Sequence, residues 1–222
     1  MAIRVADSLP RGLRYEPTPK WIRAERGGET VVDSRRAVLV WGPEKVVPAY
    51  AFPAEDVRVD LLGEATQRCA DGDLDGYVHV SWDAAERWLE EDDEVVGHPA
   101  DPFHRIDIRS SSRHVVVSLD GTVYADSQRP VLLFETGLPV RHYLPREDVR
   151  MDLLTASDHR SVCAYKGVAS YFSAPEHPNI AWTYLEPLPQ SEQVRGLIAF
   201  FDERADVTVD GAVNERPRTQ WS

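Results

Sequence analysis

The chain has 222 residues, of which 37 are acidic and 25 are basic, and its formal net charge is −12. This balance argues against nucleic acids and anionic membranes as partners, because both require a basic face. No apolar run approaches the roughly 20 residues of a spanning helix, and the first residues contain no apolar segment typical of a secretory signal. We therefore expect a cytoplasmic protein whose partner is a small molecule. The oligomeric state stays open.

The sequence repeats itself. Residues 30–62 and 122–154 share an Asp-Ser pair, a later proline and a Glu-Asp-Val-Arg run, with one residue gained or lost between them. Upstream, Trp21-Ile22-Arg23 occupies the place of His114-Val115-Val116. Two copies indicate two similar domains or one pseudo-symmetric body, since solenoids need at least three stacked units.

The first copy is recognisable only up to Leu62. Beyond it, the acidic segment 83–94 is predicted to form a helix with Trp88 and Leu89 facing inward. Three serines at 110–112 are typical of a boundary, so the predicted domains are 1–112 and 113–222. We expect the segment 95–112 to pack between them.

The second copy begins with a predicted hairpin, in which Asp120-Gly121 separates the β-branched strands 115–118 and 123–125. Apolar or alternating runs predict further strands at 130–134, 141–144, 170–172, 181–184 and 197–201. Pro145 and the acids after it predict a short helix that buries Val149, Leu153 and Leu154. The polar tail after Gly211 is expected to be irregular, with Trp221 able to dock it. The predicted fold class is mainly β, antiparallel, with a few short helices.

The second copy resembles a bacterial and fungal family, domain of unknown function 427. The motifs that carry the resemblance are Ala125-Asp126-Ser127, Leu132 to Gly137, Tyr143 to Leu154, Cys163 to Tyr171, and Trp182 to Pro189. One departure is Ala164, where the family usually has proline. The resemblance implies a small β-tent fold in each copy, similar to methionine sulfoxide reductase B.

The zinc-binding relatives in that fold hold the metal with paired CxxC motifs. This chain has only two cysteines, Cys69 and Cys163, and neither has a cysteine nearby. We therefore predict no metal and no cofactor. An alternative metal site at His98, Asp101 and His104 is weighed against an interdomain linker, which the neighbouring prolines favour. The family is also labelled nucleotidyltransferase-like, but the chain has no glycine-rich phosphate loop and no Gly-Ser followed by paired aspartates.

Residues kept in both copies are expected to serve the scaffold, so the candidate site consists of residues present only in the second copy. These are Glu135, Tyr143, Cys163, Tyr165 and Lys166. A cationic neighbour would favour a reactive Cys163 thiolate, and Lys166 could form a Schiff base if an apolar pocket lowers its pKa. Alternatively, the cysteine is a buried apolar side chain and the lysine a surface cation.

Glu135 ends an apolar run, so burial would raise its pKa towards that of a general acid. Lys166 would lower it again, and a non-catalytic ion pair is the competing outcome. Arg141 could orient an anionic substrate, while Tyr165 and Trp182 line a pocket or belong to the core.

Two classes of function follow from these candidates. The first is a small-molecule enzyme with acid–base or covalent chemistry at Cys163, Lys166, Glu135 and Tyr143. The alternative is a non-catalytic module that binds a metabolite or peptide in the same pocket. Whether the protein is an enzyme at all is left open.

Overall fold

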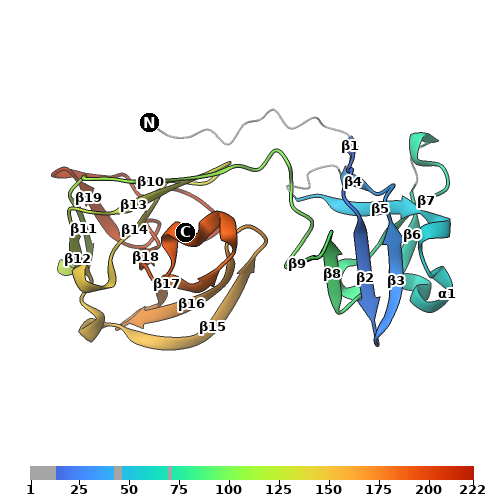
Figure 1. Cartoon of the computed structure of the whole chain (residues 1–222). Coiled ribbons are helices and arrows are strands. Elements are labelled where there is room, and N and C mark those ends of the chain that lie inside the picture. Colours follow the sequence, from blue (N-terminus) through green and yellow to red (C-terminus); the bar gives the residue numbers. More distant parts are fainter. Residues whose placement is uncertain (1–13, 43–46, 70–71) are drawn as a thin grey trace. The chain divides into compact units, whose positions relative to one another are not determined.

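The computed structural model describes residues 14–42, 47–69 and 72–222. The chain divides into two compact units between Pro102 and Phe103, called here the first and the second unit. Both are built mainly of antiparallel strands, which confirms the predicted fold class (Figure 1). The division precedes the predicted boundary at 112 because the strand β10 (Ile106–Ser110) pairs with β13 (Val131–Glu135). Among the described residues, no helix is long and apolar enough to span a membrane.

In the residues that the structure describes, the first unit contains two antiparallel sheets, with the strand orders β1-β4-β5-β7-β6 and β3-β2-β8-β9. Its strands are β1 (Arg14–Pro17), β2 (Ile22–Arg26), β3 (Glu29–Ser34), β4 (Val38–Trp41), β5 (Ala49–Pro53), β6 (Thr66–Arg68), β7 (Tyr77–Val80), β8 (Arg87–Glu90) and β9 (Asp93–Val95). One short helix, α1 (Val59–Leu62), follows β5.

The second unit contains three sheets, with the orders β10-β13-β14, β12-β11-β19-β20 and β15-β16-β17-β18. Its other strands are β11 (Val115–Leu119), β12 (Thr122–Ser127), β14 (Arg141–Tyr143), β15 (Thr155–Cys163), β16 (Gly167–Ala174), β17 (His177–Pro187), β18 (Ala199–Phe200), β19 (Asp206–Val209) and β20 (Ala212–Val213). A bridge between Leu144 and Ile198 joins the first and third of these sheets.

The strand orders of the two units correspond. The order β3-β2-β8-β9 in the first unit has its counterpart in β12-β11-β19-β20, and β1-β4-β5 has its counterpart in β10-β13-β14. Each of the hairpins β2–β3 and β11–β12 carries a register shift before its turn. The two units therefore share these two strand orders.

The residues shared by the two copies also make the same contacts. Ser34 donates to Asp56 at 2.7 Å, and Ser127 donates to Asp148 at 2.8 Å. An arginine two residues after each serine, Arg36 or Arg129, pairs with the same aspartate. These side chains tie a strand end to the following turn in each unit.

Trp21 and His114 differ in residue type but make corresponding contacts in the two units. The Trp21 indole donates to Asp33 at 2.6 Å, and a His114 ring nitrogen lies 2.7 Å from a carboxylate oxygen of Asp126. Two different side chains thus satisfy the equivalent aspartate on the neighbouring strand.

The prediction of a helix over 83–94 is wrong. This segment forms the hairpin of β8 and β9, with Glu91 at a φ of 53° in the turn. Strand β8 pairs with β2, and the Trp88 indole stacks on Trp82 at 5.0 Å and donates to its carbonyl oxygen. Strand pairing and burial of Trp88 outweigh the local helix propensity of the acidic residues.

The short helix predicted after Pro145 is replaced by two 3₁₀ turns, Arg146–Asp148 and Met151–Leu153. Val149 between them is extended and bridges to Ala125, while the Arg150 amide donates to the carbonyl of Tyr124. Pairing with β12 therefore removes the backbone donors that a continuous helix would use. Of the three predicted side chains, Val149 is buried, whereas Leu153 and Leu154 are only partly so.

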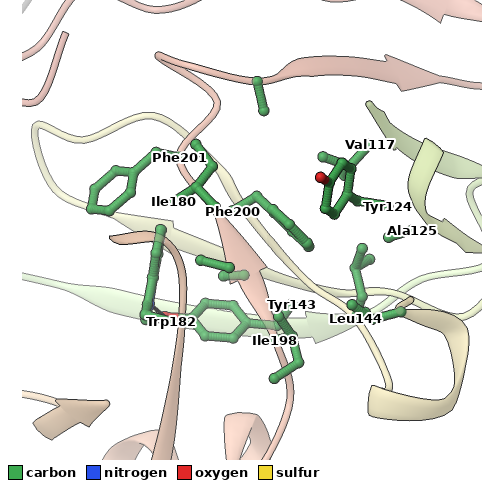
Figure 2. Close-up of a cluster of buried hydrophobic side chains, with 14 of the residues drawn as sticks. Val117, Tyr124, Ala125, Tyr143, Leu144, Ile180, Trp182, Ile198, Phe200 and Phe201 are labelled. Atoms are coloured by element: carbon green, nitrogen blue, oxygen red, sulfur yellow. Dashed lines mark hydrogen bonds between the residues drawn. The ribbon is translucent and has the colours of Figure 1, made fainter. Parts of the chain in front are cut away.

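The core of the second unit lies between its sheets. Figure 2 shows part of it, including Tyr143, Leu144, Ile180, Trp182 and Ile198. The tail beyond Gly211 adds to this core, because Trp221 packs against Phe201 with ring centroids 6.2 Å apart.

Candidate functional site

Glu135 ends β13 and holds a buried carboxylate between two cationic or potentially cationic side chains. One carboxylate oxygen lies 2.5 Å from Lys166 Nζ, and the other lies 3.0 Å from His104 Nε2. The side chains of Glu135 and Lys166 are only 5% and 9% exposed. The structure therefore brings together two residues predicted for one site and adds a third from outside the predicted domain.

A tight hairpin places Lys166 at this position. Cys163 at the end of β15 pairs with Gly167 at the start of β16, and the Lys166 amide donates to the Cys163 carbonyl. Gly167 has a φ of 92°, a conformation that favours glycine. The Cys-Ala-Tyr-Lys-Gly motif is thus the turn that carries the lysine to Glu135.

His104 reaches Glu135 through strand pairing. It directly precedes β10, in which Ile106 lies opposite Glu135, and Arg105 exchanges backbone and side-chain hydrogen bonds with Thr136. The His104 ring stacks on Tyr165 with centroids 4.2 Å apart and planes 16° apart. Sequence reasoning considered His104 only as a metal ligand or linker residue. The alternating pattern of residues 106–110 could have predicted the strand that follows His104, but not its pairing with β13.

The Glu135 carboxylate is stabilised in its charged form. Burial raises the pKa of Glu135, but hydrogen bonding from His104 and the charge of Lys166 outweigh burial and lower the pKa below its usual value. Glu135 is consequently ionised near neutral pH. This favours the roles of base or ion-pair partner over that of a general acid.

Tyr143 and Trp182 form a hydrogen-bonded pair in the core. The Trp182 indole donates to the Tyr143 hydroxyl at 3.1 Å, and the two rings are perpendicular (Figure 2). Burial raises the pKa of Tyr143, and the neighbouring Glu135 and Cys163 contribute in the same direction. Tyr143 therefore stays protonated and can serve as a hydrogen-bond donor beside Glu135.

Cys163 is half-buried at the end of β15. Its thiol is near enough to Tyr143 and Tyr184 to contribute to the raised pKa of both phenols, after burial as the main cause. Its backbone carbonyl accepts the Lys166 amide. Cys163 thus belongs to the turn that carries Lys166 to Glu135.

Arg141 is held elsewhere. Its two terminal nitrogens lie 2.8 and 2.6 Å from the two carboxylate oxygens of Glu203, in a forked pair. The guanidinium also lies within 5.8 Å of the ring centroids of Trp182, Phe201 and Trp221. An anionic substrate would have to replace Glu203 to use the same two donors, so a substrate-binding role for Arg141 stays a prediction.

Tyr165 contributes both its ring and its backbone to this region. The ring stacks on His104, while its carbonyl accepts hydrogen bonds from Gln190 and Ser191. These contacts anchor the turn to the 3₁₀ segment Pro189–Val194. Tyr165 therefore covers one side of the Glu135 cluster, as a pocket residue would.

A separate cavity of about 680 Å³ adjoins the opposite face of β13 and β14. Leu132, Phe134 and His142 line it, whereas Glu135 and Tyr143, which alternate with them along the strands, do not. None of the residues predicted for the candidate site borders this cavity.

The residues weighed as an alternative metal site, His98, Asp101 and His104, each have a different partner. A His98 ring nitrogen lies near the Pro99 carbonyl, Asp101 accepts from the Trp41 indole, and His104 contacts Glu135. Within residues 14–42, 47–69 and 72–222, no three His, Cys, Asp or Glu side chains gather as metal ligands.

Comparison with known families identifies one domain. Residues 107–211 match the family model NTP_transf_9, a domain of unknown function (DUF427). The match begins in β10 and ends after β19, so the second unit contains one such domain, which includes Glu135, Tyr143, Cys163 and Lys166 but not His104. No curated protein matches the chain.

Proposed function

We propose that the second unit is a small-molecule enzyme that uses Glu135 as a general base. The observation that carries this proposal is the buried, ionised carboxylate held between Lys166 and His104. Charged groups are costly to bury, and such clusters are enriched where a protein performs acid–base chemistry.

In the proposed reaction, Glu135 takes a proton from the substrate, and the substrate becomes an anion. The amine of Lys166, which lies 2.5 Å from a carboxylate oxygen of Glu135, stabilises that negative charge. Tyr143, which its raised pKa keeps protonated, provides a further neutral donor nearby. Glu135 then returns the proton to another atom of the substrate, which restores the ionised carboxylate.

Access to Glu135 requires one of its partners to move. The side chain of His104 is 19% exposed, compared with 9% for Lys166, and it lies outside regular secondary structure. A substrate group entering above Tyr165 would therefore replace His104. Cys163 belongs to the turn that carries Lys166 and is kept as the candidate for a covalent step.

The second candidate is a module that binds a metabolite or peptide without catalysis. It is favoured by the fact that both oxygens of Glu135 already have partners and that its pKa is lowered. In this case the Glu135–Lys166 pair would hold the turn of residues 163–167 in place, and neither residue would take part in a reaction.

Activity screening with matched variants distinguishes the enzyme from the binding module. Purified protein is incubated with pooled small metabolites, and consumed and formed species are followed by mass spectrometry. We expect Glu135→Gln to lower turnover by about 10²–10⁴-fold, the usual contribution of a general base, while substrate affinity is retained. Glu147→Gln, at an exposed carboxylate, is the control and should leave turnover unchanged. Binding without turnover would support the binding module, and turnover that survives in Glu135→Gln would contradict a base role.

We also infer that the first unit is a second, divergent copy of the same domain and that both copies have a β-tent fold. The shared strand orders and the matching Ser-Asp-Arg contacts support this. The first copy has glycine (Gly42) where the second has Glu135, so only the second would be active. An experimental structure in which residues 20–62 and 113–154 fail to superpose would contradict the duplication.

A further inference from the structure

The cavity on the far side of β13 and β14 has the character of a binding site. Its volume of about 680 Å³ is within the roughly 300–1,000 Å³ typical of small-molecule pockets. One wall is the face of the sheet that presents Leu132, Phe134 and His142, and another is formed by residues 214–219 of the C-terminal segment.

The C-terminal segment is held in place at its far end. Thr219 donates to Glu203 at 2.7 Å, and Trp221 packs on Phe201. Because Glu203 in turn holds the buried Arg141, the wall of the cavity is tied to the core of the unit.

The sheet wall is apolar and includes an aromatic ring. Phe134 is 41% exposed, which is unusual for a large apolar side chain in the middle of a strand. Leu132 and Val140 extend the same apolar surface. A ligand with an apolar body would cover these side chains and remove them from water.

The polar groups around the cavity favour a negative ligand. Arg113, Arg216 and Arg218 line it, in a protein whose net charge is −12. Arg113 lies 4.0 Å from Asp210 and Arg216 pairs with Asp206, but Arg218 makes no hydrogen bond or ion pair with any described residue. Its fork of donors is therefore available to a carboxylate.

A second polar group lies deeper. His142 is 9% exposed, and its Nδ1 is buried without a hydrogen bond, although Asp202 is 3.4 Å away. Asp202 is itself 3.8 Å from Arg141, which also pairs with Glu203. The cavity's other acid, Glu215, is exposed.

We propose that this cavity binds a small organic acid, with its apolar body against Phe134 and its carboxylate on Arg218 and His142. The site is distinct from the Glu135 cluster, because alternate residues of β13 and β14 face the two. The inference therefore goes beyond the proposed function and does not depend on it.

Amide NMR of the full chain, titrated with naphthoate and with its uncharged analogue naphthylmethanol, tests the proposal. We expect saturable shifts at Phe134, Leu138 and His142, with naphthoate binding more tightly than naphthylmethanol. Arg218→Gln should weaken naphthoate roughly tenfold, as expected for loss of one charge-assisted hydrogen bond, and leave naphthylmethanol unchanged. Phe134→Ala should weaken both ligands.

Arg150→Gln is the matched control, since this exposed arginine pairs with Asp152 and does not line the cavity. Both probes should bind this variant as they bind the unmodified chain. Equal affinity for the charged and uncharged probes, shifts centred elsewhere, or shifts that never saturate would overturn the proposal.

Discussion

Two buried ion pairs distinguish the second unit at the level of single residues. Lys166–Glu135 lies beside the turn of residues 163–167, and Arg141–Glu203 lies among the aromatic rings of Trp182, Phe201 and Trp221. A buried charge is tolerated only with a partner, so each member depends on the other. Glu203 also accepts a hydrogen bond from Thr219, which connects the Arg141–Glu203 pair to the C-terminal segment.

Replacing Arg141 by leucine should strongly destabilise the second unit. The Glu203 side chain is 0% exposed and would lose both forked hydrogen bonds. Breaking a buried pair on one side typically costs about 3–5 kcal/mol. Urea unfolding followed by tryptophan fluorescence measures the loss. Arg150→Leu, which breaks an exposed pair, should change stability by less than about 1 kcal/mol.

The pH dependence of stability gives a second measurement of the Arg141–Glu203 pair. Burial raises the pKa of Glu203, but the Arg141 and Thr219 hydrogen bonds lower it below its usual value of 4.5. A lowered folded-state pKa gives stability that is present above pH 4.5 and is lost as the pH falls through the folded-state value. In Arg141→Leu this acid-side loss should largely disappear. An unchanged acid profile would contradict the assignment.

At the level of elements, the hairpin of β15 and β16 controls where Lys166 lies. The two long strands lie side by side (Figure 1), and the turn between them is anchored by the bond from the Leu188 amide to the Lys166 carbonyl. A Cβ atom at Gly167 would lie 3.3 Å from the Glu186 carbonyl oxygen. The turn therefore has little room for any other residue.

Gly167→Ala should destabilise the second unit by about 2–3 kcal/mol, through left-handed backbone strain and crowding together. Gly137→Ala is the matched control, because Gly137 has a φ of 74° but no neighbour near its Cβ position. Gly137→Ala should lower the stability of the second unit only by the backbone strain, roughly 1 kcal/mol. Thermal unfolding of the two variants measures the difference. Equal losses would show that the contact with Glu186 is unimportant.

At the scale of the whole molecule, every hydrogen-bonded pair of named strands joins strands of the same unit. The buried apolar clusters are separate as well, with one set in residues 22–88 and the other in residues 108–209. Each unit thus has its own sheets and its own core, which is the usual basis of independent folding.

A fragment of residues 103–222 should fold alone and give amide NMR shifts close to those of the same residues in the full chain. A fragment of residues 113–222, cut at the boundary predicted from sequence, lacks β10 and the buried Ile108. Loss of one such core side chain costs about 2–5 kcal/mol, so this fragment should be markedly less stable. Equal stability of the two would contradict the assignment of β10 to the second unit.

The sequence by itself determined the mainly β class, most strands of the second unit and the Asp120-Gly121 hairpin. These features are encoded locally, by alternating apolar residues and by turn residues that tolerate a positive φ. Glu135 and Lys166, which the sequence predicts for one site, lie in direct contact.

Only the tertiary structure decided which side chains lie beside Glu135 and Arg141. His104 meets Glu135 because β10 pairs with β13, and Arg141 faces Glu203 because two segments distant in sequence pack together. The segment 83–94 became a hairpin because β2 offers it a partner. Long-range strand pairing leaves no local pattern in the residues that it joins. Burial of an aromatic ring or a charge pair can then outweigh the local preference of a segment.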